Sequence, residues 1–431
     1  MKRKASGSGV PEGFKMTELG PLPEEWDIAT LEDVATISMG QSPPGSSYNE
    51  TGRGMPFLQG KAEFGSTCPT HLKYTTMPLR KAQPGSVLIS VRAPVGAVNL
   101  ADRTYCFGRG LAALSMRNGD NMFLLHVLRH RRAAIEQLGS GSTFKAINKS
   151  ILQKVIVPCP PLHEQEQIAA ILSTVQQAKE KTEAVIAAAK EMKKSLMKYL
   201  FTYGPVPVEE AERVKLKETE IGMMPEEWYV FALGETAEVK GGKRLPKGHA
   251  FADGTTQHPY LRVVDMKNGT IDRSDLRYLC ESDYQTLSHY TIASDDVYIT
   301  IAGTIGVCGT VPMDLDGANL TENAAKIVLG SARLDKDFLA YYLSSSEAQT
   351  QISLRTCKTS QPKLALTRIR QLPVAAPTLH LQKEIASALR VLDAKVESEQ
   401  GRMEALDRLF GTLLNGLMTG RIRVNDLEVE P

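Results

Sequence analysis

Two long stretches of the chain carry apolar residues at the spacing of a coiled coil. Residues 168–199 hold two interleaved series with a period of seven, and residues 385–417 repeat the pattern with Glu399 as the one charged position. A seam of this period predicts a long helix that packs against a second helix. Each helix is expected to run about 35 residues, or about 50 Å. The predicted seam residues are Ile168, Val175, Val185, Leu196, Leu389, Leu392, Val396, Leu406 and Leu413.

The chain also repeats itself at the borders of two halves. Pro-Glu-Glu-Trp occurs at 23–26 and 225–228, and Pro-Pro-Leu-His-Glu-Gln at 160–165 is echoed at 377–382. The sequence between these borders differs greatly, so a framework is repeated while its interior varies. Loops carry specificity on a rigid scaffold, and the pattern therefore favours two different recognition surfaces on one geometry.

Together these patterns predict an α/β (α+β) fold with two similar globular domains, each followed by a long helix. Antiparallel pairing of the helices within one chain gains from the short tether between them. A coiled coil between two copies is an equal competitor on the pattern alone. The predicted boundaries are a flexible tail at 1–15, a domain at 16–160, a helix at 161–203, a linker at 204–220, a domain at 221–377, a helix at 378–420 and a tail at 421–431.

Composition narrows the class of protein. A chain of 431 residues with 42% hydrophobic residues can build two cores of roughly 150 residues each. The net charge of +2 means that a nucleic-acid partner would require positive charge gathered on one face. Six cysteines without any Cys-x-x-Cys pair are typical of a reducing cytoplasm. There is no apolar run of about 18 residues that would predict a membrane span, and the basic start is neither a signal peptide nor an anchor.

Signatures of nucleotide and methyl-transfer chemistry are weak. The Gly-Lys pairs at 60–61 and 242–243 lack the upstream Gly and the following hydroxyl residue of a phosphate-binding loop. Ser42-Pro43-Pro44 is followed by Gly45 and not by the aromatic residue that stacks a flipped base in an amino-methyltransferase. The sequence therefore predicts a plain turn there.

Two possible metal sites are equally weak. Asp253 and Asp265 could hold Mg²⁺ beside Lys267 in a nuclease, but the first half has no matching set, and short strings of this kind arise by chance. His126 and His130 have the spacing of metal ligands, yet they lie among arginines. We expect them on a basic helix face in solvent.

Polar and basic residues recur at paired loop positions of the two halves. Gln, Lys and Arg read base edges in the major groove, and hydroxyl residues beside Lys suit phosphate contacts. Each residue alone is equally well explained as a solvated side chain, so the hypothesis depends on recurrence, which includes an alignment of 139–145 with 357–363. The predicted nucleic-acid contacts are Gln59, Lys61, Arg92, Ser142, Thr143, Lys145, Lys243, Arg244, Arg262, Lys267, Lys358, Thr359, Ser360 and Lys363.

With the paired openings, the Ser-Thr-x-Lys-type loops, the helix entries and the closing Leu-Met-Thr-Gly-Arg-Ile at 417–422, the chain resembles the specificity subunit of a type I restriction-modification system. The resemblance covers residues 19 to 423, and the order of motifs matches as well as the motifs themselves. One departure is that Lys358-Thr359-Ser360-Gln361-Pro362 lacks the Gly that is usual in that loop.

The resemblance implies two target recognition domains that read the halves of a split double-stranded DNA sequence in the major groove, with the paired helices as a ruler between them. It also implies two methyltransferase subunits, which flip an adenine in each half-site, and motor-nuclease subunits for restriction. S-adenosylmethionine, ATP and Mg²⁺ would belong to those partners, and this chain would carry no cofactor, metal or catalytic residue. The alternatives are a self-sufficient nuclease or methyltransferase with a duplicated recognition module, and a coiled-coil adaptor without a DNA role.

Overall fold

The computed structural model describes residues 10–71, 73–139, 146–330, 333–357 and 361–424. The chain divides into two compact units. Unit 1 comprises residues 1–185 and 399–431, and unit 2 comprises residues 186–398.

Unit 1 is built on two sheets and two strand pairs. Its four-stranded sheet has the order β10-β9-β12-β4 and its five-stranded sheet the order β5-β7-β6-β11-β8, while β1 pairs with β2 and β3 with β13. The strands are β1 (Phe14–Thr17), β2 (Gly20–Pro23), β3 (Asp27–Thr30), β4 (Ala35–Met39), β5 (Tyr48–Asn49), β6 (Met55–Leu58), β7 (Lys73–Thr75), β8 (Lys81–Ala82), β9 (Val87–Ser90), β10 (Val98–Leu100), β11 (Tyr105–Phe107), β12 (Leu111–Met116) and β13 (Ile156–Cys159). The short helices are α1 (Leu31–Val34), α2 (Asn121–His130), α3 (Arg132–Gln137) and α4 (Lys149–Gln153).

The four-stranded sheet of unit 1 is buried on both faces. Val87 and Ile89 of β9 belong to the cluster that α2 covers, whereas Leu88 faces a second cluster with Leu58 and Phe107 of the five-stranded sheet. This follows from the period of two along a strand, because successive side chains point to opposite faces. The five-stranded sheet is thus fixed on the outer face of the first sheet, and the loops at its edge are held in place.

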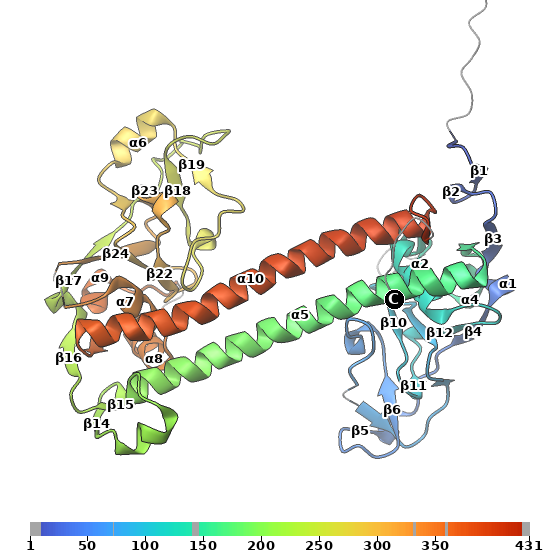
Figure 1. Cartoon of the computed structure of the whole chain (residues 1–431), viewed down its shortest axis with the longest axis horizontal. Helices are drawn as coiled ribbons and strands as arrows, with labels where there is room; N and C mark the ends of the chain where they lie inside the picture. The colour runs from blue at the N-terminus through green and yellow to red at the C-terminus, as the bar shows by residue number, and fades with distance from the viewer. Residues whose placement is uncertain (1–9, 72, 140–145, 331–332, 358–360, 425–431) are drawn as a thin grey trace, which may run out of the picture. The chain divides into compact units, whose positions relative to one another are not determined.

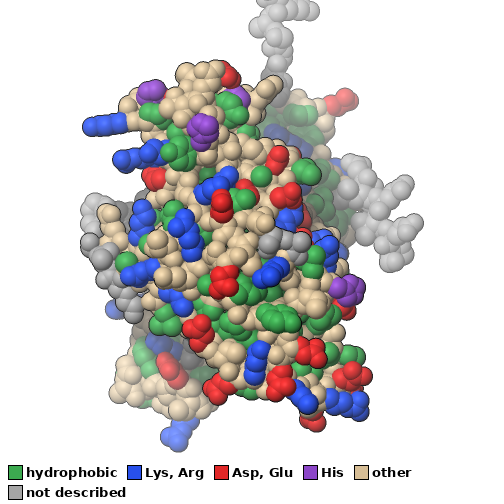
Figure 2. All heavy atoms as spheres, turned by 90° about the vertical axis from the view of Figure 1, so that its left-hand side faces the viewer, with side chains coloured by type: hydrophobic (Ala, Val, Ile, Leu, Met, Phe, Trp, Pro, Cys, Tyr) green, Lys and Arg blue, Asp and Glu red, His purple; other side chains and the backbone are tan. Residues whose placement is uncertain are grey.

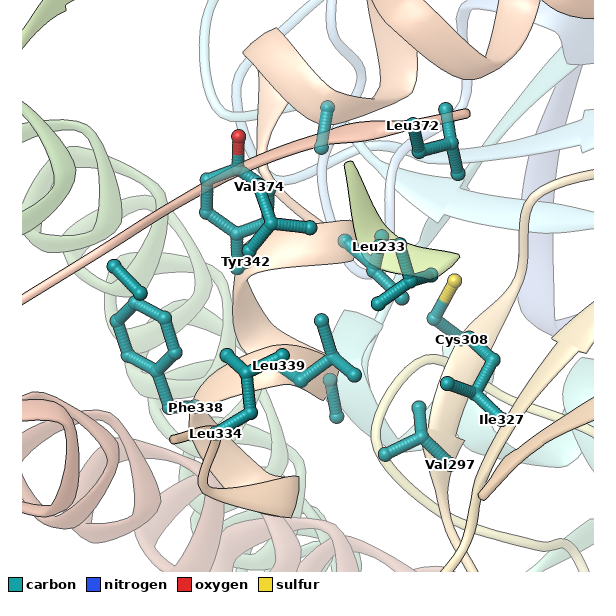
Figure 3. Close-up of a cluster of buried hydrophobic side chains, with 14 of the residues drawn as sticks. Leu233, Val297, Cys308, Ile327, Leu334, Phe338, Leu339, Tyr342, Leu372 and Val374 are labelled. Carbon is teal, nitrogen blue, oxygen red and sulfur yellow. The ribbon is translucent and has the colours of Figure 1, made fainter. Parts of the chain in front are cut away.

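Unit 2 repeats this plan with fewer strands. Its sheets have the orders β17-β24-β21-β22 and β19-β18-β23-β20, beside the pairs β14-β15 and β16-β25. The strands are β14 (Leu216–Thr219), β15 (Gly222–Pro225), β16 (Tyr229–Ala232), β17 (Ala237–Gly241), β18 (Pro259–Leu261), β19 (Arg277–Tyr278), β20 (Thr291–Ile292), β21 (Val297–Thr300), β22 (Cys308–Thr310), β23 (Ala318–Leu320), β24 (Ala324–Leu329) and β25 (Pro373–Ala376). The short helices are α6 (Glu281–Leu287), α7 (Lys336–Leu343), α8 (Ser346–Arg355) and α9 (Leu366–Arg370). Figure 3 shows the core of unit 2, where Leu339 of α7 lies on the side of the sheet residues Val297 and Ile327. The ring of Phe338 lies 5.8 Å from that of Phe201 of α5 (Leu162–Tyr203).

Two unbroken helices dominate the chain (Figure 1). They are α5 (Leu162–Tyr203) and α10 (Leu379–Met418), with 42 and 40 residues. Both are longer than the length of about 35 residues expected from the heptad series, and both lie within the predicted ranges 161–203 and 378–420. The extra turns carry Leu200 and Phe201, which are buried in the core of unit 2, and Leu417 and Met418, which are buried in unit 1. Each core therefore contains residues from both helices.

The two helices run antiparallel within each unit. In unit 1, Lys179 Nζ lies 2.6 Å from Asp407 Oδ1, and Arg423, just beyond α10, pairs with Glu164 near the start of α5. In unit 2, Lys193 Nζ lies 2.5 Å from Asp393 Oδ1. The end of α5 shares its core with residues 385–389, which lie near the start of α10. The predicted antiparallel fold is confirmed.

The predicted seam is buried or half-buried at all but one position. Ile168 and Leu389 are buried, and the intermediate seam residues are Val175, Leu196, Leu392, Val396, Leu406 and Leu413. Val185, however, is 40% exposed.

Two smaller expectations, the bounds of the linker and of the N-terminal tail, need correction. Strand β14 lies inside the predicted linker and pairs with β15. Strand β1 begins at Phe14, inside the predicted tail at 1–15, and pairs with β2. Both hairpins turn at a glycine with positive φ, Gly20 at 93° and Gly222 at 105°. The repeat therefore begins at these hairpins, before the Pro-Glu-Glu-Trp borders.

His126 lies in the core and not on a solvated face. It is fully buried on α2, with its ring 6.0 Å from that of Phe410, and neither ring nitrogen has a hydrogen-bond partner among the described residues. Burial lowers the pKa of His126 to about 3, so the imidazole is neutral at pH 7. The prediction was wrong because α2 presents this face to the sheet and to α10.

Candidate nucleic-acid interface

A polar cleft of about 490 Å³ opens in unit 1 where the ends of several strands meet. The predicted contacts Gln59, Lys61 and Arg92 line this cleft together. Sequence reasoning missed three further lining residues, which are Ser42, Tyr48 and Arg109. Residues from four separate segments thus converge on one site, as the hypothesis of a shared recognition surface requires.

Local hydrogen bonds and packing hold the walls of the cleft. The Glu63 carboxylate accepts a hydrogen bond from the Gly60 amide at 2.9 Å, which fixes the turn that carries Gln59 and Lys61. Tyr48 stacks on Phe57 with ring centroids 4.8 Å apart, and its hydroxyl donates to the Pro43 carbonyl at 2.9 Å. These contacts therefore fix the turn that carries Gln59 and Lys61 and the position of Tyr48.

The cleft carries positive charge that has no internal partner. Lys61, Arg92 and Arg109 are exposed, and no ion pair joins any of them to another residue in the described part of the chain. Unpaired cations of this kind attract phosphates, and Arg and Gln also offer the hydrogen-bonding patterns that distinguish base edges. The chemistry of the cleft suits DNA better than a small apolar ligand.

The matching region of unit 2 also presents basic residues. Lys243 and Arg244 follow β17 and are exposed. Lys243 Nζ lies 5.8 Å from the ring centroid of Tyr290, and the Tyr260 hydroxyl donates to the Lys243 carbonyl at 2.8 Å. On the face turned toward the viewer in Figure 2, Lys and Arg side chains are interspersed with acidic ones.

Two predicted contacts of unit 2 are engaged in internal ion pairs. Arg262 pairs with the buried Asp265 at 2.7 Å and with Asp275 at 3.2 Å. Hydrogen bonding to Asp265 raises the pKa of the Arg262 guanidinium above its usual value. Lys267 donates to the Val264 carbonyl at 3.0 Å and lies 3.7 Å from Asp272. Unlike the cations of the unit 1 cleft, these two are partly neutralised by their neighbours.

The third predicted locus is described only at its border. Ser142, Thr143, Lys145, Lys358, Thr359 and Ser360 lie outside the described residues. Lys363 is exposed and forms an antiparallel β-bridge with Ala302. Ala146 forms the equivalent β-bridge with Arg92. Lys363 is thus equivalent to Ala146, one residue away from the alignment with Lys145 that the sequence suggested.

In the described part of the chain, the acidic residues of the possible nuclease site do not lie together in a metal-binding arrangement, and Asp265 pairs with Arg262 instead. Asp265 is buried and faces Arg262, while Asp253 is exposed. Within residues 10–71, 73–139, 146–330, 333–357 and 361–424, no three His, Cys, Asp or Glu side chains gather in a group that could hold a metal ion. Among these residues, none of the helices is both long and apolar enough to cross a bilayer.

Known proteins match the chain over most of its length. The family of type I restriction modification DNA specificity domains matches twice, at residues 23–190 and 225–408. The MjaVIII type I restriction enzyme specificity subunit of Methanocaldococcus jannaschii is 24% identical over 96% of this chain and 97% of its own length. The putative MjaX specificity subunit of the same organism is 43% identical, but there the match spans about half of each protein, 47% of this chain and 49% of the relative.

The fold is also known from a crystal structure. The type I restriction-modification S subunit of M. genitalium aligns with a TM-score of 0.64 and 18% identity, over 91% of this chain and 96% of that one. The two family matches coincide with the two globular units and the helix that follows each. The chain therefore belongs to the family of type I restriction-modification DNA specificity subunits, which are not enzymes by themselves.

Proposed function

We propose that this chain binds a split double-stranded DNA sequence, with unit 1 and unit 2 each reading one half-site in the major groove. The observation that carries the proposal is a repeated strand framework whose exposed loop residues differ between the units. In unit 1 the framework holds Gln59, Arg92 and Arg109 around one cleft, and in unit 2 it presents Lys243 and Arg244. Residues of these types read bases and bind phosphates.

The helices set the gap between the half-sites in this proposal. At 42 and 40 residues, each spans about 60 Å at 1.5 Å per residue. Because both ends of each helix are built into globular cores, a change in helix length would be transmitted to the recognition surfaces.

The partners are two methyltransferase subunits and a motor-nuclease subunit. Proteins named type I specificity subunits match the chain almost end to end, and such subunits direct adenine methylation and restriction by their partners. S-adenosylmethionine, ATP and Mg²⁺ would bind to those partners, while this chain would determine which DNA sequence the complex recognises.

Methylation sequencing tests the proposal. Genomic DNA from cells that carry this gene with its neighbouring methyltransferase gene is compared with DNA from cells that lack only this gene. A split adenine-methylation motif that disappears with the gene is the expected result. Identical methylation in both strains would instead favour the coiled-coil adaptor.

A further inference from the structure

One backbone turn recurs in the two units with opposite charge at its tip. In unit 1 the turn spans residues 108–111, and the Leu111 amide donates to the Gly108 carbonyl at 3.0 Å. In unit 2 it spans residues 321–324, and the Ala324 amide donates to the Thr321 carbonyl at 3.1 Å. The second residue is Arg109 in one turn and Glu322 in the other.

The equivalence of the two turns rests on matching hydrogen bonds to neighbouring strands. Gly108 donates to the carbonyl of Leu58 at the end of β6, as Thr321 donates to that of Leu261 at the end of β18. The segments after β4 and β17 flank the turns in the same way. The bonds from Gln41 to Phe107 and from Gly40 to Leu111 correspond to those from Lys243 to Leu320 and from Gly242 to Ala324.

Glycine at the same place keeps each turn close to the preceding strand. A Cβ atom on Gly40 would lie 2.0 Å from the Gly108 carbonyl oxygen, and one on Gly242 would lie 2.2 Å from the Leu320 carbonyl oxygen. Neither backbone could move without breaking the bonds just described. Each turn is therefore rigid, and rigid elements place side chains more accurately than mobile loops do.

Arg109 and Glu322 each lie near residues that the sequence predicted as nucleic-acid contacts, although neither was itself predicted. Arg109 lines the cleft with Lys61 and Arg92. Glu322 lies between Leu320 and Ala324, whose carbonyls accept hydrogen bonds from Lys243 and Gly242. Its carboxylate accepts a hydrogen bond from the Thr321 hydroxyl at 3.1 Å. No ion pair joins Glu322 to any described residue.

An unpaired carboxylate is unfavourable beside DNA unless it has a specific partner. Phosphates repel it, so it cannot serve as a backbone contact. At a base edge, however, Glu accepts a hydrogen bond from the N4 amine of cytosine, whereas Arg donates to O6 and N7 of guanine. Opposite charges on equivalent turns therefore suit different bases.

We propose that Arg109 and Glu322 are specificity-determining residues that read a base at equivalent positions of the two half-sites, guanine for Arg109 and cytosine for Glu322. This inference rests on the proposed DNA recognition function. It makes the target asymmetric at one defined base, although the two units share a framework.

The test replaces each residue by Gln, which pairs best with adenine. The complete complex with its methyltransferase subunits acts on duplexes with randomised half-sites, and the methylated products are sequenced. For Glu322→Gln, cytosine preference at one base of one half-site is expected to fall about tenfold or more, with a shift toward adenine. Arg109→Gln is expected to replace guanine by adenine in the other half-site only.

Several controls keep the outcomes distinct. Glu227→Gln and Arg213→Gln make the same charge changes at exposed positions outside the turns and are expected to leave the motif unchanged. Glu322→Ala removes the acceptor without adding a donor, so that base should become unselective. An unchanged motif in the turn variants, or an equal loss of methylation on all sequences, would overturn the inference. If the parent complex selects no split motif at all, the proposed function itself fails.

Discussion

At the scale of single residues, the cations of the unit 1 cleft differ from Arg262 and Lys267 of unit 2, which already form internal ion pairs. Replacing Lys61 by Ala is expected to weaken DNA binding for all sequences and to reduce the salt slope by about one. Lys61 has no internal ion pair to lose within the described residues. The measurement is affinity for specific and non-specific duplexes across a salt series, made with the methyltransferase complex.

Arg262→Ala is the informative comparison, because its guanidinium is paired with Asp265 and Asp275. Its loss leaves the buried Asp265 carboxylate without its partner and is expected to lower the melting temperature of the chain. A Lys61→Ala variant with an unchanged salt slope would contradict the assignment of the cleft to DNA.

The buried His126 makes the stability of unit 1 depend on pH. Its pKa is about 3 in the folded chain, below the ordinary value near 6.5, so the stabilising effect of the neutral ring is complete above pH 6.5 and is lost as the pH falls toward 3. At pH 5 the loss amounts to about 2 kcal/mol. We expect His126→Leu to reduce the drop in melting temperature between pH 7.5 and pH 5.

The comparison that decides this prediction is the difference between the two pH values, because Leu can also alter packing at both. His163→Leu serves as a control at an exposed histidine of the same unit. Equal drops for the parent and His126→Leu would show that other groups cause the pH dependence.

At the scale of elements, Glu180 ties the segment after the η2 turn (Lys61–Glu63) to helix α5. Its carboxylate accepts hydrogen bonds from the hydroxyls of Ser66 at 2.8 Å and Thr67 at 2.6 Å. Burial acts to raise its pKa, but these hydrogen bonds prevail and lower it. In unit 2 the corresponding helix residue is Glu397, whose charge acts on Arg273, itself paired with Asp314 at 2.8 Å.

Glu180→Ala is expected to destabilise unit 1 by about 1–2 kcal/mol and to speed hydrogen exchange in residues 64–70. The hydroxyls of Ser66 and Thr67 would lose their shared acceptor. Glu183→Ala, at an exposed position one turn along the helix, is the matched control. Unchanged exchange in 64–70 would mean that packing alone holds this segment on α5.

Regular elements could be predicted from sequence to the extent that one local pattern specifies them. The heptad series predicted the long helices, which occur as α5 and α10. The cleft could be predicted only in part, because the parallel pairing of β6 with β11 brings Arg109 beside Gln59 from about fifty positions away. Nor does a linear pattern reveal that Arg262 is paired internally while Arg92 is not.

At the scale of the whole molecule, helix length is the variable that the proposed function depends on most. Inserting one heptad into both helices keeps the seam in phase and adds about 10 Å. The preferred gap between half-sites is then expected to grow by about three base pairs at 3.4 Å each. Methylation sequencing of the insertion variant measures the gap directly, and a gap that stayed the same would exclude the helices as the spacer.

Because each core contains residues from both helices, the two cores are expected to be completed in a fixed order while the chain is synthesised. Unit 2 is one continuous segment, residues 186–398, whereas unit 1 needs residues 399–431, including the buried Leu417 and Met418. Contacts between chain segments this far apart form late, because a long loop must close first. The first half of the chain to leave the ribosome is therefore the last to complete its core, and until then its unfinished apolar surface must be protected from aggregation.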